Sequence, residues 1–197
     1  ETVICPASMK LSTLVSQCVK RGLGGIERLA GIPGTLGGAV LMNAGAFDQQ
    51  IGERVAWVEY IDPRDGIVHT RTGEACEWGY RTSFFRGTGT LVLRVALALE
   101  PGDQQTLAET TREIQKRRTE KQPLSLPNCG SVFKRPPGGY AGAFIESGGL
   151  KGYRIGDAQI SEQHANFIVN HGRATAEEVR RLIRIVQQRV YECFQTL

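Results

Sequence analysis

Residues that could do chemistry gather in four short segments that also contain glycine or lie next to it. The first covers residues 31–38, Gly-Ile-Pro-Gly-Thr-Leu-Gly-Gly, and is followed by Asn43. Glycine lets a backbone approach a phosphate closely, and amide N–H groups at a helix start hold an anion. The segment is neither a P-loop nor a dinucleotide-binding fingerprint. A phosphate cradle and a structural turn both remain open, as do a ligand contact and a turn contact for Asn43.

The second segment is Gly-Tyr-Arg-Thr-Ser-Phe-Phe at residues 79–85. An arginine flanked by aromatic residues can hold a carboxylate with a two-pronged hydrogen bond. The alternative is that the aromatic rings lie in the core and Arg81 forms a surface ion pair. Taken alone, the pattern favours this alternative.

The third segment is Asn-Cys-Gly-Ser-Val-Phe-Lys at residues 128–134. Ser131 could donate a proton or a hydrogen bond, and Lys134 could bind an anion. Cys129 raises the hypothesis of a thiol nucleophile, but no known cysteine signature surrounds it. Such a nucleophile also needs a histidine base, for which the candidates are His69, His164 and His171.

The fourth segment combines residues 145–152 with residues 161–170. Its glycines indicate close backbone packing, and three side chains could face a polar ligand: Gln163, His164 and Asn166. The alternative is a loop entering a strand, with Asn170 in a turn before Gly172.

Composition limits the classes of function. The formal net charge is only +4, and the densest basic run, residues 116–118 with Lys121, favours a solvated helix face. We therefore expect no nucleic-acid partner. The spacing of His164 and His171 suits neither a helical pair nor common zinc sites, so we expect no metal.

Cysteine usage and hydropathy indicate the compartment. The five cysteines are odd in number, widely spaced and without a Cys-x-x-Cys motif, which favours a reducing environment over a disulfide framework. No segment resembles a signal peptide, and no apolar run approaches the roughly 18 residues of a membrane span. We expect a cytoplasmic protein with no membrane contact.

Helical and strand patterns mix along the chain without an internal repeat. Apolar residues recur at helical spacing from Leu11 to Val19, with Ser8 or Ser12 as the cap and Gly22 at the end. The other expected elements are a hairpin (55–61 and 67–71), strands at 91–99, 131–134 and 166–170, and helices at 103–121 and 175–194. This mixture predicts an α+β fold rather than a doubly wound parallel sheet. Pro101-Gly102 marks the expected boundary between two domains, 1–101 and 102–197.

Taken together and in this order, the four segments resemble the UDP-N-acetylenolpyruvoylglucosamine reductases. Residues 31–39 with 42–46 resemble the family's flavin-contacting loop, and residues 80–83 its catalytic arginine motif. Residues 130–136 resemble its catalytic serine motif. Ala143 to Leu150 and residues 164–170 match the signature of its substrate domain.

The resemblance implies a fold and a reaction. Residues 1–101 would be the second part of an FAD-binding α+β domain, and residues 102–197 a smaller α+β substrate-binding domain. NADPH reduces FAD, which in turn reduces the enolpyruvyl ether of UDP-N-acetylglucosamine to UDP-N-acetylmuramate, a peptidoglycan precursor. The implied partners are this UDP-sugar and NADPH, with no macromolecule, and a monomer is expected.

The resemblance also implies roles for single residues. Arg81 would stabilise the charge that develops toward the substrate carboxylate, and Ser131 would donate the proton. The implied flavin contacts are Ile32, Pro33, Gly34, Thr35, Gly37, Gly38, Asn43 and Ala44. The implied substrate contacts are Tyr80, Arg81, Ser131, Lys134, Arg135, Gln163 and His164, with Arg135 standing where many members have asparagine.

Departures from the family pattern lead to a second interpretation. The chain lacks the family's Gly-Gly-Gly-Ser-Asn flavin loop and its final Glu-Pro-Glu-Val strand, whose glutamate is a third catalytic residue. It has no long insertion after Arg81, so it resembles the shorter of two architectures. We expect a piece cut at both ends that is inactive alone. The alternative is a non-catalytic ligand-binding or assembly module derived from the same fold.

Overall fold

The computed structural model describes residues 1–196, which divide into two compact units. Unit 1 is Glu1–Lys116, and unit 2 begins at Arg117. The division falls inside helix α3 (Gln104–Lys121), which follows directly after the composition break at Pro101-Gly102. Each unit is described by itself.

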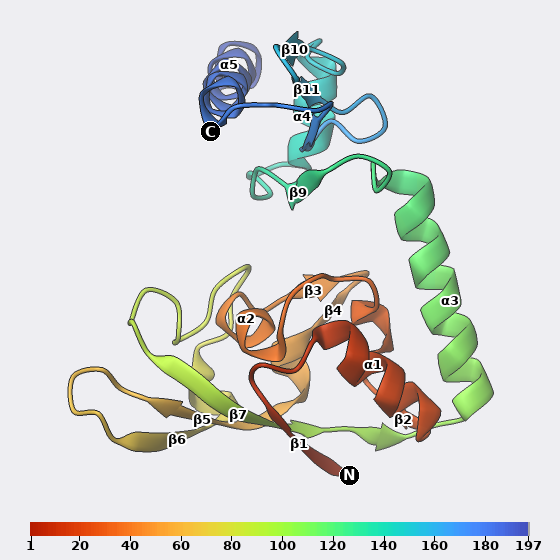
Figure 1. The fold of residues 1–197 in the computed structure, drawn as a ribbon, viewed down its shortest axis with the longest axis vertical. Helices are drawn as coiled ribbons and strands as arrows, with labels where there is room; N and C mark the ends of the chain where they lie inside the picture. The colour runs from red at the N-terminus through yellow and green to blue at the C-terminus, as the bar shows by residue number, and fades with distance from the viewer. Residues whose placement is uncertain (197) are drawn as a thin grey trace. The chain divides into compact units, whose positions relative to one another are not determined.

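Unit 1 is built on an antiparallel sheet in the order β1 (Thr2–Pro6), β7 (Leu91–Ala98), β5 (Val55–Ile61) and β6 (Val68–Thr72). The expected hairpin and the expected strand near 91–99 are confirmed. Val58 and Val95 lie opposite each other in register and are both fully buried. Figure 1 shows the helices α1 (Leu11–Lys20) and α2 (Leu36–Leu41) on one face of this sheet, and both contribute to its core.

Helix α1 has the predicted apolar stripe but not the predicted cap. Its stripe is completely buried: Leu11, Leu14, Val15, Cys18 and Val19. The expectation of a serine cap was wrong, because the N-cap is Lys10 and no side chain bonds the helix start. The N–H of Leu11 instead donates to the carbonyl of Gly34 at 3.0 Å. A distant loop therefore satisfies a group that a local side chain usually satisfies.

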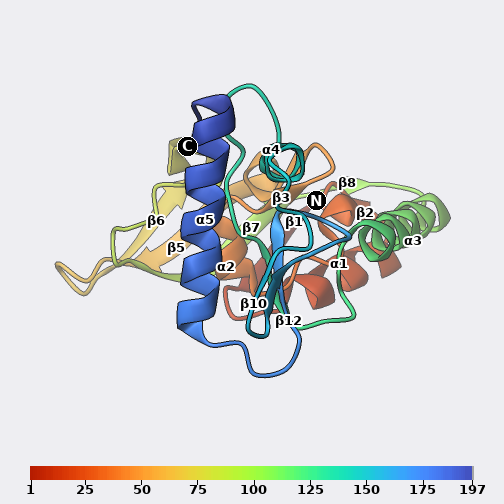
Figure 2. The same cartoon turned by 90° about the horizontal axis from the view of Figure 1, so that it is seen from above.

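Short elements in unit 1 shape the loops that carry the candidate site. Two-residue strands pair as β2 (Leu23–Gly24) with β8 (Glu100–Pro101), and as β3 (Gly45–Ala46) with β4 (Gln49–Gln50). Three short 3₁₀ turns cover Glu27–Leu29, Ile51–Arg54 and Gly73–Cys76. Seen from above, strands β5 and β6 lie side by side (Figure 2).

Unit 2 has its own antiparallel sheet, in the order β10 (Arg154–Ile155), β11 (Ala158–Ile160), β12 (Phe167–Asn170) and β9 (Asn128–Ser131). Helix α5 (Ala176–Phe194) packs against β10, β11 and helix α4 (Ala141–Ser147). The helix expected at 175–194 is confirmed, and its apolar face is buried at Leu182, Val186 and Val190.

The strand expected at 131–134 was placed too late in the chain. The paired residues are Asn128–Ser131, and Val132 to Lys134 leave the ladder. Glycine and asparagine before Ser131 do not look like strand residues, which explains the error.

Both units combine helices with antiparallel strands, so the α+β prediction is confirmed. Within residues 1–196, no helix has both the length and the apolarity needed to cross a membrane.

Candidate functional site

The predicted arginine motif forms a tight loop in unit 1. Gly79 and Thr82 bond each other's main chain in both directions, at 3.1 and 3.3 Å, so Tyr80 and Arg81 form its tip. Arg81 has φ +56°, a left-handed conformation that non-glycine residues adopt rarely and at some cost in energy. The Ser83 hydroxyl donates to the carbonyl of Leu41 at 3.0 Å and fixes the loop to the end of α2. The loop therefore has one enforced conformation.

The guanidinium group of Arg81 is anchored at one point. Its Nη2 donates to the carbonyl of Gly45 at 2.7 Å, and its Cζ lies 5.0 Å from the centre of the half-exposed Tyr80 ring. A Cβ at Gly45 would lie 2.9 Å from the Gln49 carbonyl oxygen, so this close approach requires glycine. A guanidinium has five N–H donors, and the bond to Gly45 uses one of them. The other N–H groups of the Arg81 guanidinium can therefore donate to a carboxylate.

Asn43 ties the arginine loop to the strand pair β3–β4. Its side chain is 2% exposed, and Nδ2 donates both to Gln50 Oε1 at 2.9 Å and to the Gly79 carbonyl at 3.0 Å. Its Oδ1 accepts from the Gly52 N–H at 3.1 Å. Both amide hydrogens are used inside the protein. A flavin contact at Asn43 could therefore not use these hydrogens and would have to come from Oδ1 or the main chain.

We predict that Asn43→Ala lowers the free energy of unfolding by about 2–3 kcal/mol, because the Gly79 carbonyl and the Gly52 N–H lose their partner in a buried place. Urea unfolding of the chain measures the change. The control is Gln17→Ala on the exposed face of α1, which we expect to change stability by less than about 0.5 kcal/mol. Equal effects of the two variants would contradict the role of Asn43.

The glycine-rich segment begins helix α2. Thr35 caps the helix by accepting from the Gly38 N–H at 3.3 Å. The N–H of Leu36 donates to the Met9 carbonyl, and that of Gly37 to the Ala7 carbonyl, both at 2.8 Å. The first N–H groups of this six-residue helix are thus taken within the protein, which favours the structural turn over a phosphate cradle at the helix start.

Seven of the eight predicted flavin contacts are at least partly exposed, and the eighth, Asn43, is buried. Pro33, Gly34, Thr35 and Gly38 are exposed, whereas Ile32, Gly37 and Ala44 are partly buried. A Cβ built on Gly34, at φ +111°, would meet no atom within 4 Å, so the main chain here is open to solvent.

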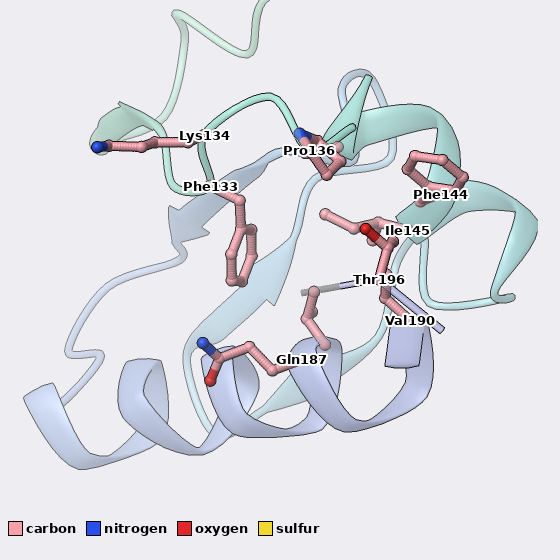
Figure 3. Close-up of a pocket in the computed structure, with 10 residues that line it drawn as sticks. Phe133, Lys134, Pro136, Phe144, Ile145, Gln187, Val190 and Thr196 are labelled. Carbon is pink, nitrogen blue, oxygen red and sulfur yellow. The ribbon is translucent and has the colours of Figure 1, made fainter. Parts of the chain in front are cut away.

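The predicted serine motif lies at the end of β9 in unit 2. Ser131 is exposed and lies opposite Phe167 in the sheet register. Lys134 and Arg135 are also exposed, and the Arg135 Cζ lies 4.2 Å from the centre of the Tyr140 ring. In Figure 3, the ring of Phe133 points into an apolar pocket while the side chain of Lys134 runs away from it. A hydroxyl and two cations therefore follow each other along one surface segment.

Two further predicted substrate contacts are engaged within unit 2. The Gln163 Nε2 donates to the carbonyls of Glu120 and Thr119, at 2.8 and 3.3 Å. His164 accepts from the Asn166 N–H at Nδ1, at 3.2 Å, so a neutral ring carries its proton on Nε2. Burial lowers the pKa of His164, and the ring packs on Phe167. His164 is thus a neutral donor, whereas the Gln163 amide is held by the end of α3.

Two buried cysteines are unsuited to nucleophilic chemistry, whereas Cys129, the cysteine of the thiol hypothesis, is accessible. Burial raises the pKa of the Cys18 and Cys76 thiols to about 11, so neither is a thiolate at neutral pH. Cys129 is a free, exposed thiol. Within residues 1–196, no group of three or more His, Cys, Asp or Glu side chains is arranged to hold a metal ion.

The structure thus brings the predicted residues together in two groups. Unit 1 joins the loop of Tyr80 and Arg81 to Asn43 and Gly45. Unit 2 joins the segment from Ser131 to Phe133 to Asn166 and to strand β12, which begins one residue later. Sequence reasoning missed the tethering by Asn43 and did not assign the one by Asn166. The sequence offers one sign of these buried asparagines: Asn43 is a single polar residue among small residues, and Asn166 is a single polar residue beside an apolar run.

Comparisons with known proteins identify the family of the chain. The family model described as UDP-N-acetylenolpyruvoylglucosamine reductase, C-terminal domain, matches residues 122–197. The reductase of that name from Alkaliphilus oremlandii is 49% identical over 98% of this chain and 63% of its own length. The one from Caldicellulosiruptor bescii is 46% identical over 95% of this chain and 60% of its own length. The chain therefore spans less than two thirds of these curated relatives.

A solved structure extends the match to the fold. The crystal structure of UDP-N-acetylenolpyruvylglucosamine reductase from Thermus caldophilus matches with a TM-score of 0.87 and 38% identity, over 94% of this chain and 68% of that chain. Order of motifs, sequence identity and fold all agree. The chain belongs to the family of UDP-N-acetylenolpyruvoylglucosamine reductases.

Proposed function

We propose that the chain carries the reaction centre for reducing the enolpyruvyl ether of UDP-N-acetylglucosamine to UDP-N-acetylmuramate. Electrons come from NADPH through FAD, the protein acts as a monomer in the cytoplasm, and the product enters peptidoglycan synthesis. The observation that carries the proposal is the enforced loop of Arg81, whose guanidinium is anchored on Gly45 and keeps donors for a carboxylate.

Arg81 has the task of binding the substrate carboxylate and stabilising negative charge. Hydride addition to the terminal carbon of the enolpyruvyl group moves charge toward that carboxylate. A planar fork holds both oxygens at once, and donors fixed before the reaction need no rearrangement as the charge develops. The left-handed backbone and the bond to Gly45 fix the fork in advance. The half-exposed ring of Tyr80 beside it would contact the substrate.

Ser131 has the task of donating the proton to the neighbouring carbon. A serine hydroxyl is a weak acid, so its alkoxide needs cations nearby. Lys134 and Arg135 follow within four residues on the same exposed segment and would supply them, while also attracting the diphosphate and carboxylate of the substrate. His164, neutral and carrying its proton on Nε2, would add a hydrogen bond.

The surface segment of unit 1 fits one wall of a flavin site. Ile32, Pro33, Gly34 and Thr35 give a small, mostly apolar and partly exposed surface, and the backbone at Gly34 is open. These are properties that a flat ring system requires of its wall. When bound, FAD supplies the hydride that it has received from NADPH. We accordingly propose residues 1–101 as the flavin-side part and residues 102–197 as the substrate-side part.

A visible absorption spectrum after FAD addition and desalting tests the proposal. Two proteins are compared: the 197-residue chain, and a hybrid in which the chain replaces the matching region of the Alkaliphilus oremlandii relative. We expect the hybrid to keep a flavin band that bleaches with NADPH and returns when the enolpyruvyl substrate is added. The chain alone is expected to keep little flavin.

The return of the band is the decisive step. A hybrid that binds flavin and is bleached by NADPH, yet is not reoxidised by the enolpyruvyl substrate under argon, would contradict the proposed reaction. Binding of the UDP-sugar without any turnover would favour a ligand-binding module instead.

A further inference from the structure

The main chain just after β9 is paired by a side chain rather than by a strand. Asn166 is 8% exposed, and its Oδ1 accepts from the Phe133 N–H while its Nδ2 donates to the Phe133 carbonyl, both at 2.9 Å. A neighbouring strand would make the same two bonds to one residue of an antiparallel ladder. The carboxamide of Asn166 therefore replaces the missing rung.

The main chain of Asn166 strengthens the same contact. Its carbonyl accepts from the Val132 N–H at 2.8 Å, and its N–H donates to His164 Nδ1 at 3.2 Å. The pairing of β9 with β12 shifts register between Phe167 and Val169, just beyond this point. Asn166 thus extends the hydrogen bonding between the two segments beyond the paired strands, and both polar atoms of its carboxamide are bonded to Phe133.

This pairing fixes the segment that carries the proposed proton donor. Ser131 lies opposite Phe167, one residue after Asn166. Phe133 is held at its main chain by Asn166 and at its ring by the apolar pocket, which is lined by Phe144, Ile145 and Val190 (Figure 3). With Ser131 and Phe133 both fixed, the main chain that leads to Lys134 is fixed as well.

We infer that Asn166 is a positioning residue for the proton-donating step, acting through the main chain of Phe133 to hold Ser131 and Lys134 in one geometry. The inference rests on the proposed function. A purely structural asparagine would affect how many molecules are folded, whereas a positioning residue affects the rate of one step in folded molecules. A misplacement of about 1 Å can reduce a rate by about a hundredfold.

Two substitutions separate these roles. Asn166→Asp keeps the shape and the acceptor for the Phe133 N–H but places a carboxylate oxygen against the Phe133 carbonyl. Asn166→Ser shortens the side chain and serves if the aspartate variant does not fold. The control is Asn170→Ala, at the end of β12, where Oδ1 likewise accepts from the main chain, from the N–H groups of Gly172 and Ala174.

The measurement is stopped-flow kinetics of the flavin-loaded hybrid, with rates referred to folded protein. For the Asn166 variants we expect flavin reduction by NADPH within twofold of the parent, and reoxidation by the enolpyruvyl substrate slower by about thirty- to a hundredfold. The Asn170→Ala control should lose stability but keep both rates within twofold.

Amide exchange of the 197-residue chain provides a second readout, because in Asn166→Ser the Phe133 amide loses its partner and should exchange at least tenfold faster. Parent-like reoxidation in a folded Asn166 variant would overturn the inference. A parent hybrid that is not reoxidised by substrate would instead overturn the proposed function, so the two failures are distinguishable.

Discussion

Replacing Arg81 with lysine is expected to reduce turnover of the enolpyruvyl substrate by about a hundredfold, with the loss in reoxidation of the flavin rather than in its reduction by NADPH. A lysine keeps the positive charge but replaces a planar fork by a point charge. It cannot donate to the Gly45 carbonyl and hold both oxygens of a carboxylate in the geometry that Arg81 offers. Loss of one fixed donor at a developing charge costs about 10²–10³ in rate.

The substitution isolates the side chain from the backbone. Arginine and lysine face the same penalty at φ +56°, and the loop keeps its bonds between Gly79 and Thr82. The unfolding free energy should therefore fall only by the contribution of the lost bond to the Gly45 carbonyl, about 1–2 kcal/mol. Stopped-flow measurement of both half-reactions in the hybrid gives the result.

A matched control uses the same change elsewhere in unit 1. The guanidinium group of Arg94 donates to both carboxylate oxygens of Glu59, at 2.7 and 2.8 Å, across the two central strands of the sheet. Arg94→Lys loses a bidentate bond without touching the loop, so its turnover should stay within twofold. Near-normal turnover of Arg81→Lys would contradict the carboxylate role.

How far sequence reasoning succeeds depends on the length of the pattern. The stripes of α1 and α5 repeat over several turns, and each fixes a buried face that the structure confirms. Strands β2, β3, β4 and β8 contain two residues each, which is too short for any periodicity. These strands form because two segments of the chain pair in the folded protein, and the local sequence of either segment does not indicate this pairing.

The same limit applies to the candidate site. Motif resemblance singled out Arg81 and Ser131 because the family keeps these side chains in recognisable neighbourhoods. The asparagines that hold their loops bond to main-chain atoms 36 and 33 residues away, Asn43 to Gly79 and Asn166 to Phe133. A main-chain carbonyl has no residue type, so the sequence gives no sign of which one a buried amide will reach. Only the folded geometry identifies these tethers.

Removing the hydroxyl of Ser131 is expected to stop overall turnover and leave the first half-reaction intact. In Ser131→Ala, NADPH should bleach the flavin of the hybrid at the parent rate, because no proton donor to the substrate is needed in that step. Reoxidation by the enolpyruvyl substrate should fall by about 10³ or more, since general acid catalysis contributes about 10²–10⁴. Stopped-flow absorbance at the flavin band separates the two steps.

The position of Ser131 makes this test clean. The side chain is exposed at the end of β9, so its removal leaves no buried group without a partner, and stability should change by less than about 0.5 kcal/mol. Ser125→Ala, at an exposed position of the loop before β9, is the control and should keep both rates. Equal loss of the two half-reactions in Ser131→Ala would contradict proton donation. It would indicate that the residue organises the flavin site, which the exposed hydroxyl beside Lys134 and Arg135 argues against.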